Sequence, residues 1–198
     1  DLFVSNSVSS GSVTNRLYHN NGDGTFTRIT TGTPVNERAD SSTAVWGDFD
    51  NDGDLDLVIS GINNAGTIVT ETYENQGGTL VFFQSLIGVQ NESSGNLAWG
   101  DYDGDGDLDL AIAGTSAGGP IARIYENNGT GWLTWDASQV LIGVHYASVA
   151  WGDYDGDGDL DLLLSGYDGA ANRTILYNYQ PLGTLSPASG RTCALTLP

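Results

Sequence analysis

The stretch WGDFDNDGDLDL, residues 46–57, decides how this chain is interpreted. Nearly the same letters return as WGDYDGDGDLDL at residues 99–110 and again at 151–162, so the copies are 53 and 52 residues apart. A fixed period of this kind is the signature of a repeat architecture, in which each repeat is one supersecondary unit. The sequence therefore predicts a repeat of about 52 residues.

Each copy contains a nine-residue loop with aspartates at positions 1, 3, 5, 7 and 9 and a glycine at position 6. Carboxylates at positions 1, 3, 5 and 9 can surround one hard cation that takes about six to eight oxygen ligands. Position 7 is expected to contribute its backbone carbonyl, with the side chains of Asp54, Asp107 and Asp159 facing outward. Calcium is the predicted ion, because the loops hold no His or Cys for zinc or copper and magnesium prefers rigid octahedra that retain water.

Other interpretations of the loop fit less well. The EF-hand and dockerin loops share the opening but need an acid at position 12 on a following helix, and here position 12 is Ile59, Ile112 or Leu164. Calcium-binding β-helices repeat their nonapeptide in series, whereas these loops recur once per period. A merely solvated turn would not keep the glycine and the spacing in three copies. Without metal, each loop holds like charges close together, so calcium is expected to be a folding cofactor.

A second series, opened by Tyr18, Tyr73, Tyr125 and Tyr177, keeps step with the loops and supplies Asn- and Gly-rich turns. Within one period, alternating apolar residues and these turns predict four strands. The candidates are residues 55–61, 67–74, 79–87 and 95–100. Four strands per repeat predict an all-β protein built from four-stranded antiparallel propeller blades.

The repeats cover residues 1–178, about three and a half copies, and the tail at 179–198 is expected to be a linker or a modified last strand. Residues 1–4 align with 56–59, so Asp1 is the last residue of a partial fourth loop. No stretch is apolar and long enough for a membrane span.

The formal charge of −19 is concentrated in the loops, which hold 15 of the 25 acidic residues. Apart from them and Asp1, nine acids face six basic residues, which leaves a charge of about −3. Acidity is therefore a property of the sites. Nucleic-acid binding is disfavoured, because no basic patch exists to neutralise phosphates.

The loop after an aromatic residue and Gly, the LDL-apolar run and the Tyr-x-Asn turn resemble FG-GAP/VCBS repeats, which build the propellers of integrin α subunits and many bacterial surface proteins. This resemblance implies three calcium sites. It assigns as ligands Asp48, Asp50, Asp52, Asp54 through its carbonyl, and Asp56; Asp101, Asp103, Asp105, Asp107 and Asp109; and Asp153, Asp155, Asp157, Asp159 and Asp161. It also implies a propeller of about seven blades, so this chain is either a fragment or associates with copies of itself as a closed dimer or a filament.

The function favoured by these features is a calcium-binding extracellular or cell-surface scaffold, with a protein or glycan ligand or copies of itself as partner. Cytosolic calcium is too scarce for the weak sites of extracellular modules. The alternative is a part of a polysaccharide-active enzyme. Catalysis is not expected, since His19 and His145 suit packing or surface roles and no catalytic triad spacing occurs. Trp132 and Trp135 are expected between blades, in preference to stacking on sugars.

Overall fold

The structure, a computed structural model, describes residues 1–4, 15–30, 34, 40–63, 65–87, 96–180 and 183–188. Within these ranges all regular secondary structure is β, which confirms the predicted class. The strands are β1 (Leu2–Val4), β2 (Arg16–Asn20), β3 (Phe26–Ile29), β4 (Asp40–Gly47), β5 (Asp56–Ile62), β6 (Ile68–Asn75), β7 (Leu80–Leu86), β8 (Leu97–Gly100), β9 (Asp109–Ser116), β10 (Gly119–Asn127), β11 (Leu133–Trp135), β12 (His145–Gly152), β13 (Asp161–Tyr167), β14 (Asn172–Gln180) and β15 (Thr184–Pro187).

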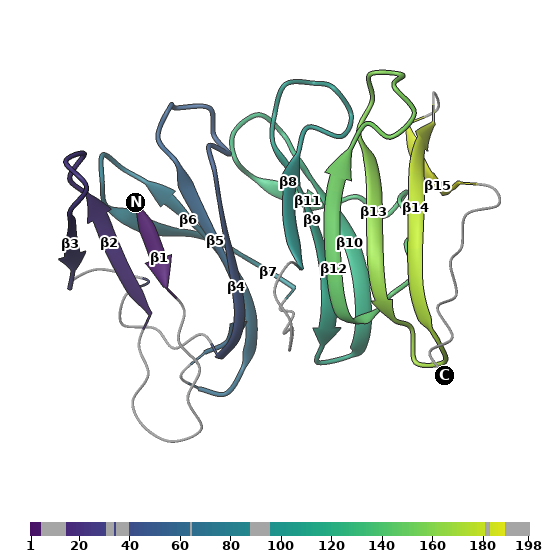
Figure 1. The fold of residues 1–198 in the computed structure, drawn as a ribbon, viewed down its shortest axis with the longest axis horizontal. Helices are drawn as coiled ribbons and strands as arrows, with labels where there is room; N and C mark the ends of the chain where they lie inside the picture. The colour runs from purple at the N-terminus through teal and green to yellow at the C-terminus, as the bar shows by residue number, and fades with distance from the viewer. Residues whose placement is uncertain are drawn as a thin grey trace.

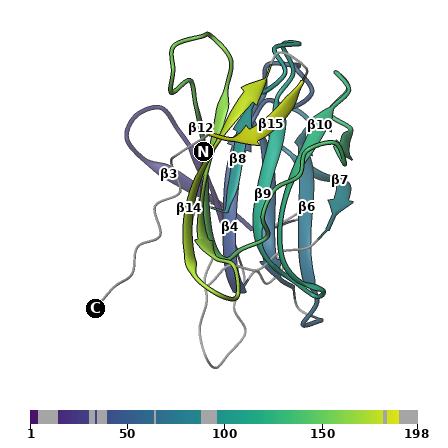
Figure 2. The same ribbon diagram turned by 90° about the vertical axis from the view of Figure 1, so that its right-hand side faces the viewer.

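The strands form four antiparallel sheets that follow one another along the chain (Figure 1). The first sheet holds β1 to β3, the second β4 to β7, the third β8 to β11 and the fourth β12 to β15, always in chain order. Seen from the end of the fourth sheet, the sheets lie one behind another (Figure 2). Three sheets thus have the four strands of a propeller blade and the first has three, as expected for a partial propeller.

The boundaries of the blades differ from the predicted repeat unit by one strand. The candidates at 55–61, 67–74 and 79–87 correspond to β5, β6 and β7 of the second sheet, but the candidate at 95–100 is β8, the first strand of the third sheet. Strand β4, which precedes the Asp-rich loop, completes the second sheet by pairing with β5, which follows the loop. Each loop therefore joins two strands of one sheet.

Each of the last three sheets presents four apolar residues to the sheet before it. In the second sheet Leu57, Ile59, Tyr73 and Leu80 are at most 6% exposed and pack with Leu17 of the first sheet. The corresponding quartets are Leu110, Ile112, Tyr125 and Leu133 in the third sheet, and Leu162, Leu164, Tyr177 and Leu185 in the fourth. Successive residues of a strand point to opposite faces, so both faces of the middle sheets are apolar and the core lies between sheets.

A tryptophan on the first strand of a sheet packs on a glycine of the sheet before it. A β-carbon added at Gly47 would lie 2.6 Å from the ring of Trp99, and one at Gly100 would lie 2.6 Å from Trp151. Any side chain larger than hydrogen would therefore push the indole away. Trp99 and Trp151 thus fill the space between successive sheets.

The prediction for Trp132 and Trp135 is wrong, because their side chains are 49% and 46% exposed. Trp135 lies in β11, the edge strand of the third sheet, which no further strand of that sheet covers. Trp132 precedes this strand and makes an edge contact with Phe83 of the second sheet, with ring centroids 5.9 Å apart. Aromatic character alone does not distinguish an edge strand from an inner one.

The tail beyond residue 178 begins as part of the last blade. Strand β14 continues to Gln180, and residues 184–187 form β15, which pairs with β14. Residues 189–198 lie outside the described part of the chain, so the interpretation of the tail as a linker or a modified last strand stays a prediction. In the described part of the chain, the structure contains no helix of the length and apolar character needed to cross a membrane.

Candidate metal centres

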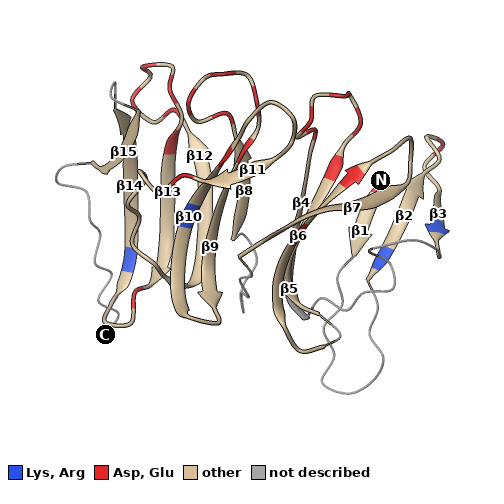
Figure 3. Cartoon of the chain, turned by 180° about the vertical axis from the view of Figure 1, so that it is seen from behind, with Lys and Arg blue, Asp and Glu red and all other residues tan. Residues whose placement is uncertain are grey.

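The three Asp-rich loops lie along one edge of the molecule (Figure 3). They connect β4 with β5, β8 with β9, and β12 with β13, so each turns the chain from the first to the second strand of a sheet. Because the sheets stand in a row with their strands in the same order, the loops recur at the same end of each sheet. Most of the negative charge of the chain therefore gathers on this edge.

Three aspartates of each loop, at positions 1, 3 and 9, converge. Each offers a carboxylate oxygen, and the three oxygens of one loop lie within 4.8 Å of one another. The groups are Asp48 with Asp50 and Asp56, Asp101 with Asp103 and Asp109, and Asp153 with Asp155 and Asp161. Three carboxylate oxygens at this separation are positioned to hold one metal ion.

The ninth-position aspartate is held by backbone N–H groups from two elements. Oδ2 of Asp56 accepts a hydrogen bond from Phe49 N at 2.9 Å, and its Oδ1 accepts one from Asn75 N, at the end of β6, at 2.8 Å. Bonds of 2.8–3.1 Å recur from Tyr102 and Asn127 to Asp109, and from Tyr154 and Tyr179 to Asp161. These aspartates are the first residues of β5, β9 and β13, so a strand closes each loop, unlike the helix of an EF-hand.

Two left-handed residues bend each loop. The glycines at position 6 have φ between 95° and 99°, and the N–H of Gly53 donates to Asp48 Oδ2 at 3.0 Å, with the same bond in the other loops. Position 4 is also left-handed, with φ of 61° at Asn51, 77° at Gly104 and 80° at Gly156. This second bend was not predicted from the sequence. Its signal is the choice of Asn and Gly, the residue types that adopt positive φ most readily.

The aspartates at positions 5 and 7 do not join the clusters. Oδ1 of Asp52 accepts a hydrogen bond from Asp54 N at 2.8 Å, and the position-5 aspartates of the other loops do the same. Asp54 is exposed, as expected for position 7, while Asp107 accepts a hydrogen bond from the Asn51 side chain of the preceding loop at 2.7 Å. The structure thus brings positions 1, 3 and 9 together, and the ligand roles of positions 5 and 7 stay predictions.

Burial makes the charged form of these carboxyls unfavourable. Desolvation, with a smaller contribution from the nearby carboxylates of the same loops, outweighs the lowering by the backbone hydrogen bonds and raises the pKa of Asp56 to about 6 and that of Asp109 to about 7. Desolvation also raises the pKa values of the third-position residues Asp50, Asp103 and Asp155. A bound cation would remove this penalty by pairing with the ionised carboxylates.

The residues at the loops fit a hard cation. Oδ1 of Asp48 is buried and has no hydrogen-bond partner, although an unsatisfied buried acceptor costs about 1–3 kcal/mol. The converging donors are all carboxylate oxygens, which suit calcium or magnesium better than zinc or copper. A cation among the three carboxylates would give this oxygen the partner that it lacks.

The three loops differ in how well the next sheet covers them. Phe49 and Tyr102, at position 2 of the first two loops, are 0% and 4% exposed, but Tyr154 of the third is 44% exposed. The end of β10 covers the first loop through Asn127, which donates to Phe49 O at 2.6 Å. The ring of Tyr179 packs edge-on against Tyr102, with centroids 5.8 Å apart. In the described structure no sheet lies beyond the third loop.

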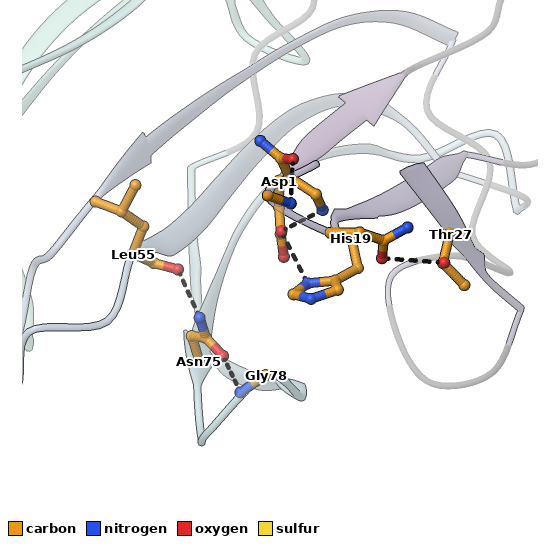
Figure 4. A network of polar contacts seen from close by, with 9 residues as sticks. Asp1, His19, Thr27, Leu55, Asn75 and Gly78 are labelled. Atoms are coloured by element: carbon orange, nitrogen blue, oxygen red, sulfur yellow. Dashed lines mark hydrogen bonds and ion pairs between the residues drawn. The ribbon is translucent and has the colours of Figure 1, made fainter. Parts of the chain in front are cut away.

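Asp1 has the position of a ninth loop residue, as the alignment with Asp56 predicts. Its Oδ1 accepts a hydrogen bond from Asn20 N at 3.0 Å, equivalent to the bond from Asn75 N to Asp56. The same oxygen lies 3.1 Å from His19 Nδ1 (Figure 4). Among the described residues Asp1 is not part of a converging acidic group. A fourth, partial site at Asp1 therefore stays a prediction.

The structure also contains a surface hollow that the sequence motifs did not predict. A hollow of about 290 Å³ lies between β10 and residues 137–143, and its lining includes Arg123, Trp135 and Val140. The Arg123 guanidinium lies 3.9 Å from the centroid of the Trp135 ring. An exposed indole beside a cation is a common feature of binding surfaces. Sequence spacing gave no signal for it, because the two residues meet only across neighbouring strands.

Comparison with known families agrees with the geometry. The FG-GAP-like repeat matches residues 1–59 and 101–164, together more than half of the chain. The matched regions contain all three Asp-rich loops. A search of curated proteins found no match. The chain belongs to the FG-GAP-like repeat family.

Proposed function

We propose that this chain is an extracellular calcium-binding repeat protein that acts as a binding or structural scaffold. The observation that carries the proposal is the recurrence of three carboxylate clusters, each closed by a buried aspartate at the start of a strand. Each cluster joins the first two strands of a sheet, so an ion there ties the loop to the blade. An ion held by carboxylates at the turn between two strands suits a structural role.

Calcium would supply a large part of the stability. If millimolar free calcium exceeds the dissociation constant roughly 10-fold, each site adds about 1.4 kcal/mol to the free energy of unfolding, and the three sites together add about 4 kcal/mol. A typical domain has a total of about 5–15 kcal/mol. Calcium sites of extracellular modules bind in the range of about 10⁻⁴–10⁻³ M, which the millimolar calcium outside cells can fill. This dependence supports an extracellular or cell-surface location.

A direct measurement of bound ions tests this proposal. Equilibrium dialysis of the full chain against calcium is expected to give three ions per chain, one for each cluster. Magnesium at the same concentration is expected to compete weakly, because it demands octahedral geometry and keeps its water. A chain that binds no calcium at 5 mM, about 5 to 50 times the dissociation constants expected above, contradicts the proposal.

The glycan ligand is proposed from the surface around Trp135. Aromatic faces stack on the apolar faces of sugar rings, and Arg123 adds a cation that suits an acidic sugar. This arginine makes no ion pair within the described structure and lies over the exposed indole. Binding of uronic-acid oligosaccharides is expected to fall at least tenfold in Trp135→Ala and to stay unchanged in Trp132→Ala. Equal binding by both variants would contradict this placement.

We further propose that the chain is not catalytic. The two histidines make contacts that suit structure: His19 with Asp1, and His145 Nδ1 with Thr115 Oγ1 at 2.8 Å, where the third and fourth sheets meet. The converging carboxylates are explained by metal binding. Turnover of a polysaccharide by the purified chain would overturn this proposal and favour the enzyme alternative.

A further inference from the structure

The first two Asp-rich loops are joined by a chain of buried hydrogen bonds. Phe49, at position 2 of the first loop, donates its N–H to Asp56, and its carbonyl oxygen accepts a hydrogen bond from the Asn127 side chain. The N–H of Asn127 in turn donates to Asp109, the ninth residue of the second loop, at 2.8 Å. All four residues are at most 1% exposed. Two residues therefore link the ninth-position carboxylates of two clusters.

The turn that follows Asn127 packs closely on the first loop. Oδ1 of Asn127 accepts hydrogen bonds from Gly129 N at 3.2 Å and from Gly131 N at 3.0 Å. A β-carbon added at Gly131 would lie 2.6 Å from the ring of Phe49 and 3.2 Å from the β-carbon of Asp50. The Asn127 side chain thus holds this turn and the first loop in one arrangement.

A second hydrogen bond joins the same two loops at the surface. The side chain of Asn51, at position 4 of the first loop, donates to Asp107 Oδ1 of the second loop at 2.7 Å. The other two loops have Gly104 and Gly156 at position 4, and all three residues are left-handed. Among the three loops, the first is therefore the one whose position 4 has a side chain to reach its neighbour.

The contact between the second and third loops has a different character. Tyr179 takes the place of Asn127, and its N–H donates to Asp161 in the same way, at 3.0 Å. Its ring meets the ring of Tyr102 edge-on, with centroids 5.8 Å apart. Within the described ranges no hydrogen bond connects the second loop with the third loop or with Tyr179. The hydrogen-bonded link is thus specific to the first two loops.

We propose that Asn127 and Asn51 couple the first two clusters, so that filling one cluster with calcium raises the affinity of the other. This inference rests on the proposed binding of calcium. Without a cation the carboxylates of each cluster repel one another, and the two loops must be ordered against that repulsion. Because hydrogen bonds hold the loops in one frame, ordering one loop also orders the other, so the second cluster fills at a lower cost in conformational entropy.

Repulsion between two bound cations opposes this coupling. The repulsion weakens with distance and is screened by salt over about 8 Å at physiological ionic strength. It acts in the same way between the second and third clusters, which also lie on successive sheets. Comparing the two pairs of clusters therefore isolates the contribution of the hydrogen bonds.

Calorimetric titration of calcium into chains that keep two clusters tests the coupling. Asp153→Asn removes a carboxylate of the third cluster and leaves the first and second, whereas Asp48→Asn leaves the second and third. Neither aspartate belongs to the hydrogen-bond chain through Asn127. In the Asp153→Asn chain, filling one cluster is expected to raise the affinity of the other at least about fivefold, the lower end of typical coupling. In the Asp48→Asn chain, the two clusters are expected to fill without positive cooperativity.

Replacing the two asparagines in the Asp153→Asn chain assigns the coupling to them. Asn127→Ala removes the bond to Phe49 O and keeps the backbone N–H that holds the second cluster. Asn51→Gly introduces the residue type of the other two loops and removes the bond at the surface. Each change is expected to reduce the coupling, and both together are expected to abolish it. Circular dichroism checks that each variant is folded, and Asn51→Gly, at an exposed position, carries the test if Asn127→Ala does not fold.

Asn75→Ala is the matched control for Asn127→Ala. Asn75 has the same place in the second sheet, and its side chain bonds Leu55 O and Gly78 N of that sheet (Figure 4). Among the described residues this side chain reaches no other Asp-rich loop. Asn75→Ala should therefore leave the coupling between the first two clusters intact, whatever it does to the affinity of the first.

The outcomes separate this coupling from the proposed function. Clusters that bind calcium independently in the Asp153→Asn chain would overturn the coupling and keep the calcium-binding scaffold. Equal cooperativity in both two-cluster chains would also overturn it, because the second and third loops lack the hydrogen bonds. So would a loss of coupling in Asn75→Ala, which would point to a general effect of stability. A chain that binds no calcium would overturn the proposed function and the coupling with it.

Discussion

Aspartate has distinct roles at the different positions of each loop. At position 9 it is buried and organises the backbone of two elements, at positions 1 and 3 it completes the carboxylate cluster, and at position 5 it caps the N–H of position 7. The alternation of aspartates in the sequence predicts a metal site but not this division. The difference arises from the direction of each side chain, which the left-handed residues at positions 4 and 6 determine.

Replacing one buried aspartate should separate metal binding from folding. Asp56→Asn removes one carboxylate of the first cluster, so one calcium site is expected to be lost. In saturating calcium the variant should lose roughly 2.7 kcal/mol of stability, the contribution of one site filled at about 100 times its dissociation constant. Denaturant titration measures this change.

The matched control is Asp54→Asn in the same loop, because Asp54 is exposed and outside the cluster. It should keep three bound ions and the parental stability. In a chelator, Asp56→Asn should cost clearly less than in calcium, since the charge that it removes is then buried and unpaired. Equal losses with and without calcium would show that Asp56 is only structural.

The raised pKa values predict an unusual pH dependence for the protein without divalent cations. The pKa values of Asp56 and Asp109 in the folded state, about 6 and about 7, lie above the ordinary value of 3.8. Between these values the folded state binds more protons than the unfolded state, so the free energy of unfolding falls as the pH rises from about 4 to about 7. Calcium should abolish this fall, because it holds the carboxylates ionised.

Denaturant unfolding at pH 5 and pH 8 gives the change in the free energy of unfolding with pH. It is measured once in a chelator and once in calcium. The chelated protein is expected to be more stable at pH 5 than at pH 8. Rising stability over this interval in the chelator would contradict the burial of these carboxyls.

At the scale of the strands, the apolar pattern predicts three strands of the second sheet closely. It does not predict which strand starts a sheet, because a strand before a loop and a strand after it have the same local pattern. Pairing across the loop decides the grouping, and it depends on contacts between residues far apart in sequence. The wrong prediction for the exposed residues Trp132 and Trp135 has the same cause, since a sequence pattern does not distinguish an edge strand from an inner one.

The glycine on the first strand of each blade provides a test of the packing between sheets. Gly100→Ala places a β-carbon 2.6 Å from the Trp151 ring, so the indole must move. Such overpacking costs about 1–3 kcal/mol. Gly152→Ala makes the same chemical change with nothing within 4 Å and should alter the stability by less than about 0.5 kcal/mol.

Thermal unfolding of both variants in calcium compares the two positions. Trp151 fluorescence is expected to shift in Gly100→Ala alone. Equal stability of the two variants would contradict the close packing of the Trp151 ring against Gly100.

At the scale of the molecule, the sequence predicts the repeats and the concentration of negative charge in the loops. The structure places this charge on one edge (Figure 3). The sequence does not predict which faces of the first and fourth sheets are uncovered in the described structure. Their residues have the same types as the buried residues of the middle sheets, and Leu163 differs from Val58 only in having no sheet beyond it. Exposure at these positions is therefore set by the number and order of the sheets.

The central claim is that calcium in the three loops stabilises the fold, and thermal unfolding of the full chain tests it most directly. The melting temperature is measured in millimolar calcium, in excess EGTA, and in EGTA followed by renewed calcium. Millimolar calcium is about ten times a dissociation constant of roughly 10⁻⁴ M, so each filled site contributes about 1.4 kcal/mol and the three sites about 4 kcal/mol. EGTA is therefore expected to lower the melting temperature by about 10 °C. Renewed calcium is expected to restore it. A melting temperature that is the same in calcium and in EGTA would contradict the account.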